Sequence, residues 1–379
     1  MQKASSAPKL RFPEFLDEWR VLQLGDCAEV DPKTEKLPEY FTYIDLDSVN
    51  DGILTKVKLI SKTNAPSRAQ RVLKHKDILF QTVRPYQQNN LFFRNWDGEY
   101  VASTGYAQIR AREDSMFLYQ YLHTNRFVSR VLTRCTGTNY PAINSSDLVK
   151  ISISLPAICE QQKIAEFLTA VEKKIEAMRK RIDLLKQYKK GVMQAIFSRT
   201  FRFKNENGND FPDWEEKKLG DIATIKTGNL NVQDATDNGE FAFFDRSEEI
   251  KKYNEYTFNN EALIYSGEGS EFLPRYFNGK YGLHQRSYTI FDAKGVGVKY
   301  LYYFLLTQNK HFLRMAVGST VKSLRMDCFH KCQIPQPSNE EQQKIADFLT
   351  SLDDKINLEA KKLEQAKWFK KSLLQQMFV

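Results

Sequence analysis

The sequence predicts an α+β protein in which two globular domains alternate with two long helices, as a pseudo-twofold duplication. Residues 160–175 (EQQKIAEFLTAVEKKI) recur at 341–356 as EQQKIADFLTSLDDKI, and eleven of the sixteen positions are identical. A second set of motifs recurs ahead of each copy, and apolar residues follow helical spacing through both copies. An offset of 181 residues indicates a duplicated domain, because solenoid repeats are only about 20–50 residues long.

The segments ahead of the repeated helices are duplicated as well. In both halves Phe-Pro precedes a Trp, and four residues separate that Trp from Leu-Gly-Asp: Phe12-Pro13, Trp19 and Leu24-Gly25-Asp26, then Phe211-Pro212, Trp214 and Leu219-Gly220-Asp221. Each half then has an apolar strand-like run, an aromatic helical stretch, a loop of small residues and a strand ending in Pro: 76–83, 117–127, 136–142 and 151–156, then 261–267, 300–312, 317–323 and 332–335. The middle segments differ, since RPYQQNNLFF has no counterpart in GEGSEFLPRYF. Two domains with the same flanking motifs but different middle segments indicate that each domain performs the same task on a different target.

These patterns predict a globular domain at 1–156, a central helix at 157–199, a second globular domain at 200–338 and a C-terminal helix at 339–379. Steps of four and three residues separate the apolar positions of each helix, which defines the seam of a coiled coil: Ile164, Leu168, Val171, Ile175, Met178, Ile182 and Leu185, then Ile345, Leu349, Leu352 and Ile356. Helices of about 40 residues are about 60 Å long. We expect the two to pair as an antiparallel coiled coil, although an ordinary core-facing helix would also carry such a stripe.

The charge distribution indicates a polyanion as the binding partner. The net charge is +9, and residues 51–96 hold nine Lys or Arg against two acidic residues. Residues 273–331 hold ten against two, whereas residues 200–272 carry eight basic and sixteen acidic residues. Solvated surface lysines would instead alternate with acidic residues along the chain. Such segregation favours a basic face that binds nucleic acid.

Composition also bears on compartment and chemistry. No apolar run is long enough to span a membrane, MQKASSAPKL lacks the apolar core of a signal peptide, and five cysteines form no regular framework, so we expect a cytoplasmic protein. No phosphate-binding glycine loop, Asn-Pro-Pro-aromatic tetrapeptide or His-Glu-x-x-His motif is present. Cys328, His330 and Cys332 would share one face of a strand, but without a fourth ligand they indicate buried thiols and no metal site. The chain is therefore predicted to be non-catalytic.

The paired motifs resemble the specificity (S) subunits of type I restriction–modification systems. The resemblance runs from about residue 8 to the C-terminus, and it rests on Pro156 with Glu160-Gln161-Gln162-Lys163-Ile164 and on Pro335 with Glu341-Gln342-Gln343-Lys344-Ile345. GSTVKSLRMD (318–327) is similar to the end of that family's second domain, whereas the first copy departs from it with GTNYPAINSSD. Base contacts therefore cannot be transferred from one half to the other.

The resemblance implies that each globular domain is a target-recognition domain that reads one half of a gapped, asymmetric site on double-stranded DNA. It implies that the helices set the gap and dock two methyltransferase (M) subunits, which use S-adenosylmethionine to methylate adenine at N6, and that two restriction (R) subunits, which use ATP and Mg²⁺, join them. The residues of the two EQQK segments would cap their helices or bind a partner: Glu160, Gln161, Gln162, Lys163, Glu341, Gln342, Gln343 and Lys344. No cofactor is expected in this chain, and no membrane partner.

Side chains able to contact bases gather in a few short segments of each half. Arg and Lys recognise guanine and Asn and Gln recognise adenine in the major groove, although lysines more often contact phosphates. The first half offers Arg84, Tyr86, Gln87, Gln88, Asn89, Asn90, Asn139 and Tyr140. The second half offers Ser266, Glu268, Gln285, Arg286, Ser319, Lys322, Ser323 and Arg325. A polar surface turn would have the same composition, so exposure and contacts decide between the two interpretations.

Three other classes of protein share parts of this pattern. A stand-alone DNA-binding or architectural protein with two unlike heads would bind DNA tightly without a methyltransferase partner. A methyltransferase or nuclease with unrecognised motifs would act alone. A coiled-coil adaptor would bind only protein, which the segregated basic segments disfavour. None of the three accounts for the paired motifs.

Overall fold

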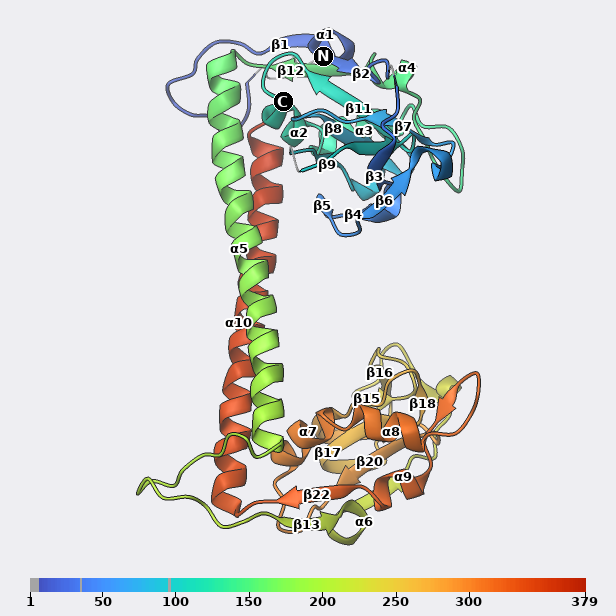
Figure 1. Ribbon diagram of the computed structural model, residues 1–379, viewed down its shortest axis with the longest axis vertical. Coiled ribbons are helices and arrows are strands. Elements are labelled where there is room, and N and C mark those ends of the chain that lie inside the picture. Colours follow the sequence, from blue (N-terminus) through green and yellow to red (C-terminus); the bar gives the residue numbers. More distant parts are fainter. Residues whose placement is uncertain (1–6, 35, 95–96) are drawn as a thin grey trace. The chain divides into compact units, whose positions relative to one another are not determined.

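The computed structural model describes residues 7–34, 36–94 and 97–379. The chain forms two compact units, of which unit 1 comprises 1–179 with 361–379 and unit 2 comprises 180–360. Each unit therefore contains one globular α+β part and a segment of both long helices, α5 (Ile158–Phe197) and α10 (Asn339–Gln376) (Figure 1). The N-terminal residues 1–6, which belong to the segment without signal-peptide character, lie outside the description. Within the described ranges, no helix combines the length and the apolar character needed to cross a membrane.

Unit 1 is built on two four-stranded sheets. One has the order β6-β3-β10-β7, and the other has the order β2-β11-β8-β9. The strands of the first are Lys58–Ser61, Tyr40–Ile44, Tyr100–Ser103 and Ala69–Val72, and those of the second are Ala28–Val30, Tyr106–Ala111, Ile78–Gln81 and Leu91–Phe92. Two short ladders complete the unit: β1 (Arg20–Gln23) with β12 (Ser152–Leu155), and β4 (Val49–Asn50) with β5 (Ile53–Leu54). Helices α1 (Leu24–Cys27), α2 (Ser115–Tyr121), α3 (Asn125–Leu132) and α4 (Ser145–Leu148) connect the strands.

Unit 2 has one mixed sheet of six strands in the order β14-β20-β17-β19-β15-β16, in which only the β15–β19 pair is parallel. These strands are Thr224–Thr227, Ser287–Phe291, Phe258–Ser266, Arg275–Leu283, Phe241–Phe244 and Lys251–Tyr253. Helices α7 (Val298–Leu306) and α8 (Asn309–Met315) pack on the sheet, and Phe312 contacts Tyr265 of β17 with 5.3 Å between ring centres. The remaining elements are β13 (Glu215–Lys218) with β22 (Gln333–Gln336), β18 (Glu268–Gly269) with β21 (Lys322–Ser323), α6 (Leu219–Ile222) and α9 (Met326–His330).

The structure confirms the antiparallel pairing of the long helices. In unit 2, Arg181 faces Glu359 at 3.8 Å and Lys189 contacts Asp353 at 2.5 Å, so the chain directions oppose. In unit 1, Lys370 contacts Glu172 at 2.6 Å. The pairs Lys189–Asp353 and Lys370–Glu172 occupy equivalent positions of the repeat, since both members are related by the offset of 181 residues. The seam residues Ile164, Leu168, Ile175, Ile182, Ile345, Leu349, Leu352 and Ile356 are all buried.

The two aromatic helical stretches differ from the prediction because each is broken into two helices. Residues 117–127 span α2 and the start of α3, and residues 300–312 span α7 and the start of α8. In unit 1 the break has a local cause, since the Thr124 hydroxyl accepts a hydrogen bond from the Phe127 N–H at 3.2 Å and starts a new helix. The strand considered for 328–332 is also wrong, because Met326–His330 form helix α9. Among the described residues, no group of three or more His, Cys, Asp or Glu could hold a metal ion.

Candidate nucleic-acid interface

In unit 1 the two loops with candidate DNA contacts lie side by side. Val83 pairs with Ala142 in an isolated bridge, and the Arg84 N–H donates to the Pro141 carbonyl at 2.7 Å. The Arg84 guanidinium lies over the Tyr140 ring, 4.1 Å from its centre. This stacking holds a cation and an aromatic face together, and both groups can contact a nucleotide.

The loop after β8 has a fixed backbone. Arg84 and Gln88 both have left-handed conformations with φ of 54°, on either side of a short 3₁₀ turn over Pro85–Gln87. The buried Gln81 side chain supports this turn, since its amide donates to the Val83 carbonyl at 2.7 Å and to Gln87 Oε1 at 2.8 Å. Gln81 was not predicted as a site residue. Its one signal in the sequence is a polar residue at the end of the apolar run ILFQ.

Most of the predicted residues of unit 1 are accessible. Tyr86, Gln87, Asn139 and Tyr140 are exposed, and Arg84, Gln88 and Asn89 are partly exposed. Arg84, Gln87, Asn89 and Tyr140 line one surface pocket of ≈ 510 Å³ together with Asp47 and Lys56. The pocket presents hydrogen-bond donors and acceptors beside an aromatic ring, which is the chemistry that base edges require.

Asn90 is a correction, because its side chain is 1% exposed and is engaged inside the unit. Asn90 Oδ1 accepts from the Gln81 N–H at 2.8 Å, and Asn90 Nδ2 lies 3.3 Å from His123 Nε2. His123 Nδ1 in turn lies 2.7 Å from the Tyr119 carbonyl. This arrangement requires a neutral His123 that donates from Nδ1 and accepts at Nε2, so Asn90 stabilises the fold and is not available to DNA.

We expect unit 1 to lose stability as the pH falls below about 6.5, the ordinary pKa of histidine. Burial lowers the pKa of His123 to about 4. The unfolded chain therefore binds a proton that the folded chain excludes, and this contribution is complete above pH 6.5 and is lost between pH 6.5 and 4. The upper bound is about 3 kcal/mol, reduced to roughly 2 because His123 as a residue is only partly buried. Urea unfolding at pH 7 and pH 5 checks this, and the difference should shrink in His123→Gln.

In unit 2 three segments converge beside the end of β17. Pairing of β18 with β21 places Glu268 opposite Ser323 and Gly269 opposite Lys322. The Ser266 hydroxyl donates to the Glu268 carbonyl at 2.6 Å and holds the turn between β17 and β18. Lys322 and Ser323 belong to the small-residue loop 317–323, so the predicted residues of this loop and of β18 form one surface.

Two arginines share the Glu268 carboxylate. Arg246 Nη1 donates to Glu268 Oε2 at 2.7 Å, and Arg286 Nη1 donates to Glu268 Oε1 at 2.6 Å. The hydrogen bond from Arg246, followed by that from Arg286, lowers the pKa of Glu268, so the carboxylate is ionised near neutral pH. Arg246 was not predicted as a site residue, and it lies in the acidic segment FFDRSEE.

The other predicted residues of unit 2 lie at the surface of the unit. Gln285 donates to Asn231 Oδ1 at 2.7 Å, and Gln285, Ser319, Lys322 and Arg325 are exposed. Ser266 and Ser323 are partly exposed. No buried side chain of the kind found at Asn90 occurs among the eight residues predicted in this unit, all of which are described.

The two candidate surfaces occupy equivalent places in the repeated fold. The loops are closed by the bridges Thr136–Ala142 and Val317–Ser323, which are related by the helix offset of 181 residues. The residue after each loop donates its N–H to the end of the adjacent strand segment: Ile143 to Thr82 at 3.1 Å, and Leu324 to Gly267 at 2.8 Å. The frame is therefore retained while the side chains on it differ.

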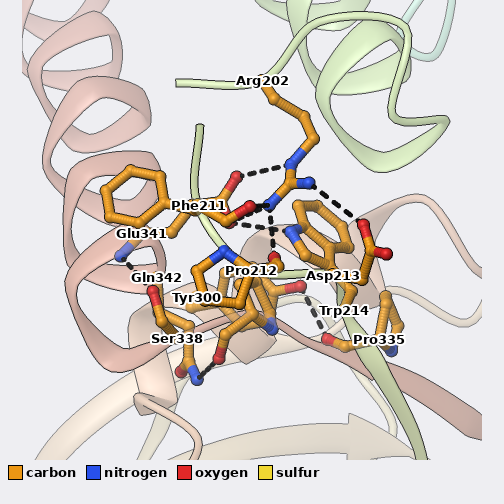
Figure 2. Close-up of polar contacts among 11 residues, drawn as sticks. Arg202, Phe211, Pro212, Asp213, Trp214, Tyr300, Pro335, Ser338, Glu341 and Gln342 are labelled. Carbon is orange, nitrogen blue, oxygen red and sulfur yellow. Dashed lines mark hydrogen bonds and ion pairs between the residues drawn. The ribbon is translucent and has the colours of Figure 1, made fainter. Parts of the chain in front are cut away.

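The start of helix α10 is held by an ion pair between the buried Glu341 and the partly exposed Arg202 (Figure 2). Arg202 donates from Nε and Nη2 to the Glu341 carboxylate at 3.1 and 2.8 Å, and the Trp214 indole N–H donates to the same carboxylate at 2.8 Å. Arg202 also donates to the carbonyls of Phe211 and Pro212 at 3.1 and 2.7 Å. Gln342 bonds the Pro337 carbonyl and the backbone of Gly295 and Gly297 at 2.8–2.9 Å. The Phe-Pro…Trp motif and the EQQK motif thus form a single junction.

The first copy repeats this junction with one difference. Arg11 donates from Nε and Nη2 to the Glu160 carboxylate at 2.7 and 2.8 Å, and Gln161 bonds the Pro156 carbonyl at 2.9 Å and Glu113. The Trp19 indole N–H, by contrast, is buried and has no hydrogen-bond partner among the residues that the structure describes. These ion pairs raise the pKa of Arg11 and of Arg202.

Four of the residues predicted to bind a partner are therefore corrected. Glu160, Gln161, Glu341 and Gln342 are 0–3% exposed and bond within their own units, so they fix the helix starts instead. Gln162, Lys163 and Gln343 are exposed and Lys344 is partly exposed. Lys163 pairs with Glu14 at 2.5 Å, and Lys344 with Glu340 at 3.4 Å, which leaves these side chains at the surface.

Comparison with known proteins identifies the class to which this duplicated fold belongs. The family model described as "Type I restriction modification DNA specificity domain" matches residues 16–187 and 212–367. The chain therefore belongs to the type I restriction–modification specificity family, as its motifs predicted.

Individual relatives agree with this assignment. The specificity subunit of the type I restriction enzyme MjaVIII from Methanocaldococcus jannaschii is 23% identical, over 96% of this chain and 92% of the relative. The EcoDI specificity subunit of Escherichia coli is 29% identical over 40% of this chain and 34% of its own length. Among solved structures, the type I S subunit from M. genitalium has a TM-score of 0.59 at 16% identity, covering 98% of this chain and 99% of that one, and so shares its fold. A chain from a study of complex assembly and conformational transition of the type I R-M system has a TM-score of 0.57 at 22% identity, covering 95% and 97%.

Proposed function

We propose that the chain selects a gapped, asymmetric DNA sequence for a type I restriction–modification complex. Residues 1–156 and 200–338 are the two target-recognition domains, and each reads one half of the site. One observation carries this proposal: the two candidate surfaces sit at equivalent places of a duplicated frame, closed by bridges 181 residues apart, yet carry unlike side chains. Two copies of the same loop arrangement that carry different base-contacting side chains suit a DNA site whose two halves differ in sequence.

Catalysis in the complex belongs to the partners. Two methyltransferase subunits with S-adenosylmethionine methylate adenine at N6, and two restriction subunits with ATP and Mg²⁺ cleave DNA. Duplicated surface features support two identical partners: Tyr188 in QYKK and Phe369 in WFKK are related by the same offset and are 55% and 50% exposed. Together with Gln162, Lys163, Gln343 and Lys344, they provide two equivalent docking surfaces, because exposed aromatic residues are enriched at protein interfaces.

Mapping N6-methyladenine across the genome of the source cell, with and without this gene, tests the proposal. We expect deletion to remove methylation from one bipartite motif whose halves differ. If the pattern does not change while the methyltransferase gene is expressed, the chain acts as a stand-alone DNA-binding protein instead.

The same map tests the role of the helices as a spacer. The helices pair antiparallel, so the gap between the half-sites should change only when both helices are lengthened. We therefore consider insertions of seven residues in each helix, one beside Arg179 and one beside Lys361. An insertion of seven residues retains the heptad phase. Seven residues add about 10 Å, or about three base pairs at 3.4 Å each. A folded, active variant that kept the original gap would rule the spacer role out.

A further inference from the structure

We propose that Arg246 and Arg286 each read a guanine in the half-site recognised by unit 2, and that Glu268 is the positioning residue that aims both. The inference rests on the proposed function, in which this unit reads DNA. It adds Arg246, which no sequence motif indicated, and it changes the role of Glu268 from a base contact to a support for two base contacts.

Both guanidinium groups keep hydrogen-bond donors that are available to a base. Each arginine uses Nη1 for the Glu268 carboxylate, and within the described ranges neither side chain makes a further hydrogen bond. The Arg246 and Arg286 side chains are 45% and 61% exposed, whereas that of Glu268 is 17% exposed. Each arginine thus retains an accessible edge of Nε–H and Nη2–H donors, which matches the O6 and N7 acceptors of guanine in the major groove.

The backbone fixes the two segments that carry Glu268 and Arg286 against each other. The Gly267 N–H donates to the Arg286 carbonyl at 2.9 Å. A Cβ built at Gly267 would lie 2.1 Å from that same carbonyl oxygen, so the approach requires glycine at this position. Glu268 follows directly, and its carboxylate bridges two arginines from separate connections of the sheet. Pre-organisation of this kind reduces the rotamer freedom that binding would otherwise remove.

The carboxylate also favours a base edge over a phosphate as the ligand. Two arginines that served only to bind phosphate would bind it more strongly with their full charge of +2. The ionised Glu268 between them lowers the net charge of the cluster to +1. It also repels an approaching phosphate, whereas a neutral guanine edge is not repelled in this way. The bonds to Glu268 orient the planar groups, and orientation matters most for bidentate contact with a base.

The test is a methylation assay with the complex of this chain and its methyltransferase partner, on a DNA library that varies each position of the target singly. We expect Arg246→Ala to reduce the preference for guanine at one position of the second half-site roughly 10- to 100-fold, and Arg286→Ala to do so at another. Glu268→Gln is expected to weaken both preferences together while the melting temperature stays the same. Lys252→Ala, which removes an exposed charge elsewhere in the unit, is the matched control and leaves every preference unchanged.

Two results would overturn the inference. Uniform weakening for all sequences with a shallower salt dependence would show that the arginines contact phosphates. A second half-site in which the wild-type complex has no preference for guanine would exclude the readout directly. If the wild-type complex methylates no bipartite motif at all, the proposed function itself fails, which this design detects before any variant is compared.

Discussion

Replacing Phe378 with alanine is expected to destabilise unit 1 by about 3–5 kcal/mol, the usual effect of removing a buried aromatic ring. Phe378 lies just beyond α10 and is 8% exposed. Its ring contacts Phe117, Tyr121 and Trp19, with ring centres 5.2, 5.7 and 6.3 Å apart. Leu373, Leu374 and Met377 enter the same core. Residues 373–378 therefore complete the hydrophobic core of unit 1.

Hydrogen exchange followed by mass spectrometry measures this effect separately in the two units. We expect faster exchange in α2 and β12 of unit 1 and no change in the sheet of unit 2. Trp368→Ala is the control, because that side chain belongs to the same helix but is 71% exposed. Equal loss of protection in both units would contradict the assignment of Phe378 to the core of unit 1.

The second large effect is expected for Glu341→Ala, which should lower the free energy of unfolding of unit 2 by about 3–5 kcal/mol. The substitution leaves the Arg202 guanidinium and the Trp214 indole N–H without their shared acceptor (Figure 2). Glu160→Ala is expected to have a smaller effect in unit 1, because the Trp19 indole N–H makes no bond to Glu160. Urea unfolding monitored by fluorescence and circular dichroism gives both values.

A double-mutant cycle separates the ion pair from the other contacts. The double variant with Arg202→Met and Glu341→Leu should lose less free energy of unfolding than the two single variants lose together. Each single variant leaves one charged side chain without its partner, whereas the double variant leaves none. Glu340→Ala, at an exposed neighbouring position, serves as the control and is expected to change stability by less than about 0.5 kcal/mol. Additive effects of Arg202 and Glu341 would show that their contact contributes nothing.

Much of the fold could be predicted because the repeated motifs mark the same element boundaries in both halves of the sequence. The seam from Ile164 to Ile182 and the strands before Pro156 and Pro335 have a periodicity that local sequence determines, and the structure has them where they were expected. The breaks at 122–124 and 307–308 were missed, since aromatic residues occur on both sides of each break, and only the first break has a side-chain cap, at Thr124.

The candidate sites were less predictable, for reasons that depend on tertiary contacts. Asn90 belongs to a polar loop, but its side chain faces Gln81 and His123, and local composition cannot show which side of a loop is buried. Arg246, Glu268 and Arg286 come from three separate connections of a six-stranded sheet, so only the strand order brings them together. The repeated EQQK segments indicated that these residues have the same role in both halves. They did not indicate that Glu160 and Glu341 form ion pairs with Arg11 and Arg202 at the helix starts.

The position of residues 373–378 in the core of unit 1 has a consequence for synthesis of the protein. A ribosome that has made the whole first recognition domain still lacks the side chains that fill its core, and these follow only after unit 2 has been translated. The core of unit 1 is therefore complete only after unit 2 has been synthesised. A chain that stops before residue 373, after a frameshift or a premature stop codon, lacks four of the side chains that fill the core of unit 1.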